Sequence, residues 1–163
     1  MKFKGLFVAK CFKNGKLVWE DVIKNLITDQ GINYILDTSL TGLTAVSTLY
    51  LIPFETNYTP LAADTYASKG FVESQTYNES IRQAYTISST STKSFNNTNY
   101  PAVMVFNAVK TIYGLAVVGG SSIKGDSAAS EGILLAAGKF DSSKALTSGK
   151  VLSLTYTITG SSS

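Results

Sequence analysis

The chain begins with two segments in which apolar and polar residues alternate, residues 3–12 and 16–22, joined by Asn14-Gly15. Alternation with a period of two is typical of a β-strand, and Asn-Gly supplies both positive-φ residues of a type I′ turn. The pattern therefore predicts an N-terminal β-hairpin. Cys11 falls on the apolar face of the first strand, where we expect a small buried hydrophobe rather than a reactive thiol.

One short helix is predicted after the hairpin, over about residues 29–40. Ile32 and Ile35 recur at helical spacing, and Thr28 is a suitable N-cap residue. Gly31 lies inside this segment, although glycine weakens a helix by up to ~1 kcal/mol relative to alanine. We therefore expect the helix to pack closely against a strand at Gly31, where a side chain would not fit.

From residue 48 onward the pattern is β-like, with Gly, Ser, Asn and Pro residues between the apolar runs. Strands are predicted at 48–54, 102–118, 133–140 and 151–159, and one strand or a bent strand pair at 71–87. An ordered loop is predicted at 56–69, a mobile loop at 88–99, a polar loop at 121–130 and a frayed end at 160–163. In the run 102–118, apolar residues occur at both odd and even positions, as in strands that are covered on both faces.

Together these elements predict a mainly β fold. We expect an antiparallel β-sandwich of jelly-roll-like topology, with an N-terminal β-hairpin and one short helix near residues 29–40. The length of 163 residues fits a single domain that spans residues 1–163.

The composition excludes several classes of protein. With 44% hydrophobic and 15% charged residues, the chain is neither disordered nor a coiled coil. It has no histidine and one cysteine, which excludes Ser-His-Asp and Cys-His catalysis, an internal disulfide and most metal sites. We expect a protein that is not an enzyme and binds no cofactor or metal ion.

The charges are unevenly distributed along the chain. Residues 1–24 hold six lysines against Glu20 and Asp21, whereas residues 25–89 hold six acids against Lys69 and Arg82. Such a pattern can steer identical subunits into head-to-tail contact, although scattered surface charge is its commoner meaning. The single arginine and the absence of adjacent basic residues argue against nucleic-acid binding. No apolar run approaches the length of about 18 residues that a membrane helix needs.

The acidic residues do not form a recognisable catalytic pair. In an extended strand, Glu73 and Glu79 would lie roughly 20 Å apart, whereas glycoside hydrolysis requires a separation of about 5 to 10 Å. Asp64, Asp126 and Asp141 lack the alternating spacing of a calcium loop. We expect these side chains to be solvated surface charges.

Arg82 and the tyrosines are the most informative polar residues. Arg82 is predicted on the solvent-exposed face of the strand at 71–87, where it can form a salt bridge with Glu73 or Glu79. Such a salt bridge would either stabilise the strand or bind another subunit. Seven of the nine tyrosines fall between residues 50 and 113. Tyrosines are frequent at protein interfaces and can stack on sugars, but strands also favour them. The candidate interface residues are Tyr58, Tyr66, Tyr77 and Arg82.

Two stretches with scattered positions over most of the chain form a recognisable pattern. The first stretch is the hairpin leading into Trp19-Glu20, Lys24-Asn25-Leu26-Ile27-Thr28, Gly31 and Ile35-Leu36. The second comprises Tyr58-Thr59-Pro60, Ala63-Asp64-Thr65, Glu73, Tyr77, Arg82, Tyr113-Gly114 and the closing strand from Leu152 to Thr159. These positions resemble small virion structural proteins of tailed bacteriophages. Proteins of this kind are head-decoration, cement or other capsid- and tail-associated components, and they have no catalytic residues to transfer.

The resemblance implies a non-enzymatic virion protein that is assembled in the bacterial host cytoplasm. We expect a head-decoration or accessory capsid protein that forms a homo-oligomer. Its partners would be the major capsid protein or other virion proteins, which it would bind through strand edges and tyrosine-rich surfaces. Two alternatives remain open: a tail-associated receptor- or carbohydrate-binding module, and, with least support, an enzyme acting on cell-wall glycans through Glu73.

Overall fold

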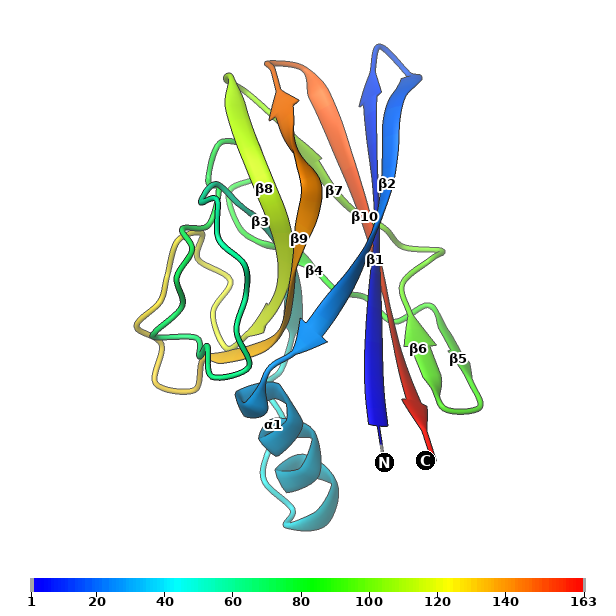
Figure 1. Cartoon of the computed structure of the whole chain (residues 1–163), viewed down its shortest axis with the longest axis vertical. Coiled ribbons are helices and arrows are strands. Elements are labelled where there is room, and N and C mark those ends of the chain that lie inside the picture. Colours follow the sequence, from blue (N-terminus) through cyan, green and yellow to red (C-terminus); the bar gives the residue numbers. More distant parts are fainter. Residues whose placement is uncertain (1, 163) are drawn as a thin grey trace.

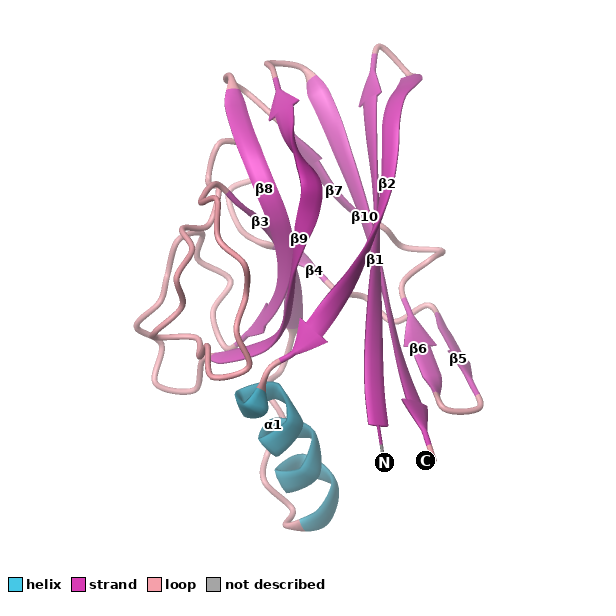
Figure 2. Cartoon of the chain, viewed as in Figure 1, coloured by secondary structure: helices cyan, strands magenta, loops and turns pink. Residues whose placement is uncertain are grey.

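The structure is a computed structural model that describes residues 2–162. It contains one α-helix and ten β-strands in this part of the chain (Figures 1 and 2). In chain order they are β1 (Lys2–Lys13), β2 (Lys16–Ile27), α1 (Asp29–Leu40), β3 (Leu49–Phe54), β4 (Gln83–Ala84), β5 (Ser89–Ser91), β6 (Ser94–Asn96), β7 (Ala102–Val105), β8 (Lys110–Gly119), β9 (Ile133–Leu146) and β10 (Lys150–Ser161). No helix in the described residues has the length and apolarity needed to cross a membrane.

The strands form one antiparallel sheet that curls into a half-barrel. The strand order is β4-β3-β8-β9-β2-β1-β10-β6-β5, and β7 pairs with β10. Figure 1 shows β2 crossing from the β1–β10 side to the β9 side, where Leu26 and Ile27 pair with Ala137 and Ala136. The mainly β, antiparallel prediction is confirmed, but a two-sheet sandwich of jelly-roll topology is not confirmed.

The N-terminal hairpin is confirmed. Asn14 and Gly15 have φ angles of 51° and 75°, and Lys13 pairs with Lys16 across the turn. On the inner face of β1, Phe7 and Cys11 are fully buried, as the alternation predicted.

The helix is also confirmed, with the predicted cap. The Thr28 hydroxyl accepts a hydrogen bond from the Gly31 N–H at 3.0 Å and donates one to the Leu134 carbonyl. A side chain at Gly31 would collide with the Leu135 carbonyl oxygen of β9. The close approach to a strand therefore explains a glycine inside the helix.

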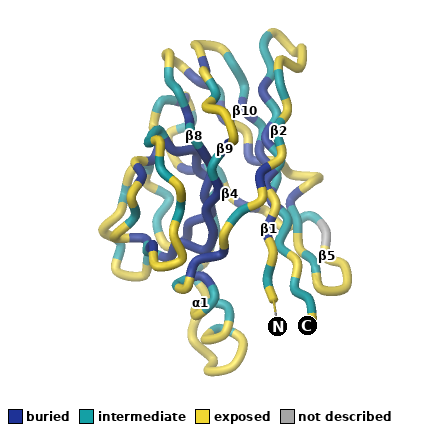
Figure 3. Tube along the Cα trace, in the orientation of Figure 1, coloured by how far each residue is buried: buried dark blue, intermediate teal, exposed yellow. Residues whose placement is uncertain are grey.

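The apolar core has two parts that lie on opposite faces of β3, β8 and β9. The inner part fills the half-barrel and includes Leu115 and Val117 of β8. In the outer part of the core, Tyr66 and other residues of the loops 55–82 and 120–132 cover Ala116 and Val118 of the same strand. Strand β8 is therefore apolar on both faces, as predicted, and it is buried along most of its length (Figure 3).

The prediction of a long strand at 71–87 is wrong. Only Gln83–Ala84 pairs as a strand, and Glu73 and Tyr77 form isolated bridges to Phe54 and Phe106. The prediction of a solvent-exposed face in this segment is also wrong, because Ser74 and Arg82 are buried. The alternation in this segment reflects packing of a loop against β3 and against the loop 120–132, not one face of a sheet.

Two further expectations fail near the C-terminal half. The predicted mobile loop at 88–99 contains the β5–β6 hairpin, which pairs with β10. The predicted frayed end begins inside a strand, because β10 continues to Ser161 and Gly160 pairs with Phe3. Ser163 lies outside the described residues. Pairing with β10 orders the first segment and pairing with β1 orders the second, and neither contact could be read from the local sequence.

Candidate functional site

Arg82 and Glu73 form a buried ion pair, with exposed fractions of 1% and 5%. The Arg82 Nε lies 3.0 and 3.1 Å from the two Glu73 carboxylate oxygens, and Nη2 lies 2.6 Å from Oε2. The Gly125 N–H donates to the same Oε2 at 2.9 Å. Three donors, Arg82 Nε, Arg82 Nη2 and the Gly125 N–H, therefore hold the carboxylate in place.

The other Arg82 donors tie two loops together. Nη1 donates to the Tyr66 hydroxyl and the Ser121 carbonyl, each at 2.8 Å, and Nη2 donates to the Asp126 carbonyl at 2.6 Å. Burial lowers the pKa of Arg82, but the hydrogen bonds to Glu73 and Tyr66 outweigh it and leave this pKa raised. Arg82 thus stays charged and joins the loop 55–82 to the loop 120–132.

The four predicted interface residues lie close to this network. Tyr66, Tyr77 and Arg82 are each 1% exposed, so the chain itself buries them. Tyr77 packs on Phe106, with Lys124 Nζ 4.2 Å from its ring centroid, and burial raises its pKa. Tyr58 is half-buried and donates a hydrogen bond to Asp64 at 2.9 Å. Their contact with a partner stays a prediction.

The acids are used within the fold. Glu79 accepts hydrogen bonds from the Val105 N–H at 3.1 and 3.3 Å, and Asp64 accepts one from the Leu61 N–H at 2.8 Å. Within residues 2–162 no group of three His, Cys, Asp or Glu residues is placed to hold a metal ion. Burial raises the pKa of the Cys11 thiol, which disfavours the reactive thiolate.

A first candidate surface is the outer face of the β1–β2 hairpin, which the described chain leaves uncovered. Val8 pairs directly with Val22, and Leu6 with Lys24. Val22 is 53% exposed, and three apolar neighbours are 36 to 52% exposed. We call this surface the hairpin face, and its side chains are Lys4, Leu6, Val8, Lys10, Phe12, Leu17, Val18, Glu20, Val22 and Lys24.

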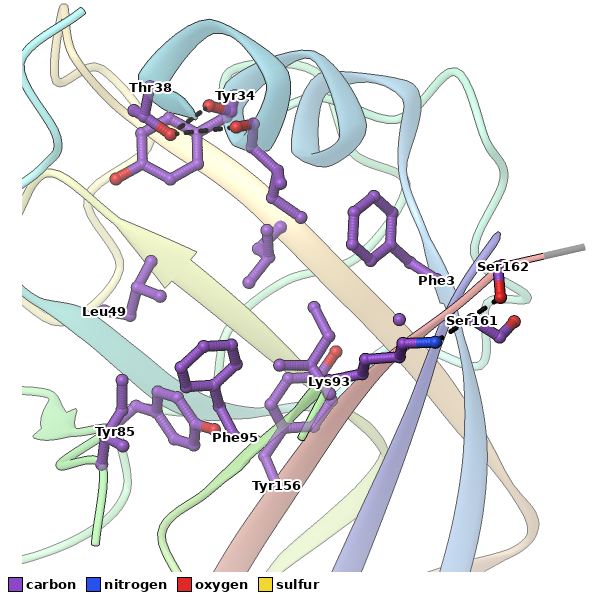
Figure 4. A pocket seen from close by; sticks show the side chains of 15 residues that line it. Phe3, Tyr34, Thr38, Leu49, Tyr85, Lys93, Phe95, Tyr156, Ser161 and Ser162 are labelled. Atoms are coloured by element: carbon purple, nitrogen blue, oxygen red, sulfur yellow. Dashed lines mark hydrogen bonds between the residues drawn. The ribbon is translucent and has the colours of Figure 1, made fainter. Parts of the chain in front are cut away.

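The second candidate is an apolar groove of about 720 Å³ inside the open end of the half-barrel. Its walls come from α1, from the start of β1, from β3, β6 and β9, and from the end of β10. Figure 4 shows Tyr34 on the helix side, Tyr85 and Phe95 on the opposite side, and Phe3 near the termini. The groove therefore combines residues from nearly the whole length of the chain.

The floor of the groove is aromatic. The Tyr85 and Tyr156 rings meet edge to face, with centroids 5.7 Å apart. Burial raises the pKa of Tyr85 to about 12, and it also raises that of Tyr156. Among residues 2–162 the Tyr85 hydroxyl has no hydrogen-bond partner, whereas the Tyr156 hydroxyl accepts a hydrogen bond from Asn25 at 3.2 Å. An unpartnered buried hydroxyl is costly and therefore uncommon in a native protein.

The rim of the groove is basic. Lys93 is the only charged residue among the described residues that line it, and Figure 4 shows its side chain reaching toward Ser162, with Nζ 3.5 Å from the hydroxyl. A smaller neighbouring groove is lined by Lys2 and Phe3, and it too contains no acid.

Compared with known families and with curated proteins, the chain matches no family model and no curated protein.

Sequence reasoning missed both surfaces, for different reasons. For the hairpin face a signal was present but was not used. Leu6 and Val8 alternate with Lys4 and Lys10 on the same face of β1, so this outer face is half apolar. The groove has no comparable signal, because its walls meet only when β1 and β10, from opposite ends of the chain, lie side by side.

Proposed function

We propose that this chain is a non-enzymatic structural protein of a tailed-bacteriophage virion, a head-decoration or accessory capsid protein that binds the shell through the hairpin face. The observation that carries the proposal is the row of uncovered apolar side chains on that face. The resemblance of the sequence to phage virion proteins supplies the class of partner, the major capsid protein or another virion protein.

The charge on the hairpin face indicates the chemistry of the partner surface. Lys4, Lys10 and Lys24 lie on this face, and the only acid among its residues is Glu20, whose Oε2 is 3.4 Å from Lys10 Nζ. The Lys10–Glu20 pair lies between the Val8–Val22 pair and Phe12, and the three lysines leave the face with a net positive charge. The face therefore complements an apolar patch that carries acidic side chains. We expect the partner to present such a patch, with about 800 Å² buried on each side if the contact is specific.

The strand edges are less suitable for adhesion than the face. The strands at the two ends of the sheet order, β4 and β5, have two and three residues. Short edge strands offer few unpaired backbone groups to a partner. We therefore place the contact on a sheet face, and a homo-oligomer or a regular array would strengthen weak contacts through multivalency.

Cosedimentation with capsids that lack decoration tests this proposal. We expect the chain to be retained at physiological salt, and Val22→Glu to reduce retention at least about tenfold, because a carboxylate would be buried against an acidic surface. Leu61→Glu is the matched control. Leu61 lies outside the hairpin face, and its exposed fraction of 56% is close to the 53% of Val22. Failure of the unmodified chain to bind, or equal binding of both variants, would contradict the proposal.

The alternative of a tail-associated receptor- or carbohydrate-binding module has less support. Tyr66 is buried beneath Arg82, and the Tyr58 hydroxyl is bound to Asp64, so the tyrosines considered for sugar stacking are mostly used inside the fold. Glycan-array binding that is lost in Tyr58→Ala would favour this alternative over the hairpin face.

A further inference from the structure

The apolar groove is a separate feature from the hairpin face, and nothing in the proposed function uses it. Its volume of about 720 Å³ lies within the range of about 300 to 1,000 Å³ that is typical of small-molecule sites. Figure 1 shows α1 extending beyond the end of the sheet, and Tyr34, Ile35 and Thr38 of this helix line the groove. Among the lining residues, Ile87 and Phe95 are 50% and 45% exposed.

Lys93 has a backbone conformation that only a few residues adopt readily. Its φ of 65° is in the left-handed region, and Asn14 is the only other non-glycine residue with positive φ within residues 2–162. Glycine or asparagine would suit this turn better. The Lys93 ammonium group has no carboxylate within ion-pair distance in the described residues, so it is available to an anionic ligand.

We propose that the groove binds a free long-chain fatty acid. The alkyl chain would lie on the apolar walls formed by Tyr156, Ile158 and Leu135, and the carboxylate would sit at the rim beside Lys93 Nζ. An apolar trough with a single cationic group at its mouth matches an amphiphile that has one anionic group.

The same charges argue against a second copy of the chain as the occupant. Lys93 lines the larger groove and Lys2 the smaller one, and neither groove has an acidic lining residue. Two copies joined groove to groove would bring their own lysines together without a counter-charge. A fatty acid carries the missing negative charge.

Isothermal titration of the purified full chain with palmitate, below its critical micelle concentration, tests the proposal. We expect saturable binding at one site per chain. Replacing palmitate with the uncharged alcohol of the same length should lower the affinity about tenfold, because the charge-assisted contact is lost.

Two variants locate the site. Lys93→Gly should lower palmitate affinity about tenfold without loss of fold, since glycine accepts the positive φ, and the alcohol should then bind this variant as it binds the unmodified chain. Phe95→Ser should weaken both ligands. The controls are Lys16→Ala and Ile123→Ser, which change an exposed lysine and a 64% exposed isoleucine outside the groove.

Three outcomes would overturn the proposal. The first is absence of saturable palmitate binding. The second is equal affinity of the unmodified chain and Lys93→Gly for palmitate. The third is binding to vesicles of anionic phospholipid, or self-association through Phe95, without binding of free palmitate. None of these outcomes bears on retention by capsids, so this proposal and the proposed function can fail independently.

Discussion

At the residue scale, the first turn of α1 shows how single side chains fix the helix to the sheet. The Thr28 hydroxyl joins the Gly31 N–H to the Leu134 carbonyl. The Gln30 Oε1 accepts from the N–H groups of Leu134 and Tyr66 at 2.8 and 2.9 Å. Because Gly31 has no side chain, the helix backbone can approach β9 closely enough for these bonds.

Gly31→Ala should therefore destabilise the protein although alanine is the better helix former. We expect a loss of about 1 to 3 kcal/mol from overpacking against Leu135, which exceeds the gain of up to about 1 kcal/mol in helix propensity. Urea unfolding measures the change. Asn33→Ala, at an exposed position of the same helix, is the control and should be neutral or slightly stabilising. Equal stability of both variants would show that α1 can move away from β9.

At the scale of elements, the loops 55–82 and 120–132 form an outer layer over β3, β8 and β9. They have little regular structure, and Arg82 supplies the bonds that join them, to Ser121 and Asp126 on one side and to Glu73 and Tyr66 on the other. A buried pair of this kind holds one arrangement of the loops, because removing either partner leaves a charge in an apolar interior.

Arg82→Met should cost about 3 to 5 kcal/mol in the free energy of unfolding, since Glu73 would then be buried without its counter-charge. The double variant Arg82→Met, Glu73→Leu should recover part of this loss. Lys10→Met provides a matched control, because the Lys10–Glu20 pair is exposed, with side-chain exposures of 45% and 43%, and should cost at most about 1 kcal/mol. If Arg82→Met and Lys10→Met lower the free energy of unfolding by similar amounts, the buried pair has no special structural role.

At the scale of the whole molecule, the interior contains several tyrosines whose phenols are kept neutral by burial. Tyr77, Tyr85 and Tyr156 are 1%, 7% and 0% exposed, and desolvation raises the pKa of each, that of Tyr85 to about 12. In the unfolded chain these phenols ionise near their ordinary pKa of about 10. Folding is thereby linked to proton binding at alkaline pH.

Stability should be fully retained below pH 10 and should fall between about pH 10 and 12. In this window the unfolded state has lost phenolic protons that the folded state still holds, and each unit by which a pKa is raised corresponds to about 1.4 kcal/mol. Circular dichroism and phenolate absorbance during alkaline titration measure the transition.

Tyr85→Phe removes one of these groups without removing a hydrogen bond, because the Tyr85 hydroxyl has no partner in the part of the chain that the structure describes. This variant should lose less stability than the unmodified protein between pH 10 and 12. Tyr100→Phe is the control, since Tyr100 is 60% exposed and should leave the transition unchanged. If Tyr85→Phe unfolds at the same pH as the unmodified protein, Tyr85 does not contribute to the linkage.

Local patterns were sufficient for the hairpin, for α1 and for most of the long strands. Asn14-Gly15 selects its turn from backbone preference, Thr28 begins the helix through its own hydroxyl, and alternation within a strand separates its buried face from its exposed face. Even the tight packing at Gly31 was predictable, because a glycine inside a helix needs a local reason. Each of these features depends on residues a few positions apart.

The fold and the candidate surfaces depended on contacts between distant residues. Arg82 was expected on a solvent-exposed strand face. Its hydrogen-bond partners Ser121 and Asp126 are 39 and 44 residues away in the sequence. Contact with them buries Arg82 in a loop. The groove likewise forms only where β1 meets β10 at the other end of the chain. Sequence alone determined the hairpin, α1 and most of the long strands, because their turns, caps and alternation are local. Tertiary structure decided the curl of the sheet, the burial of Arg82 and the position of the groove, because each arises from the closing of long loops.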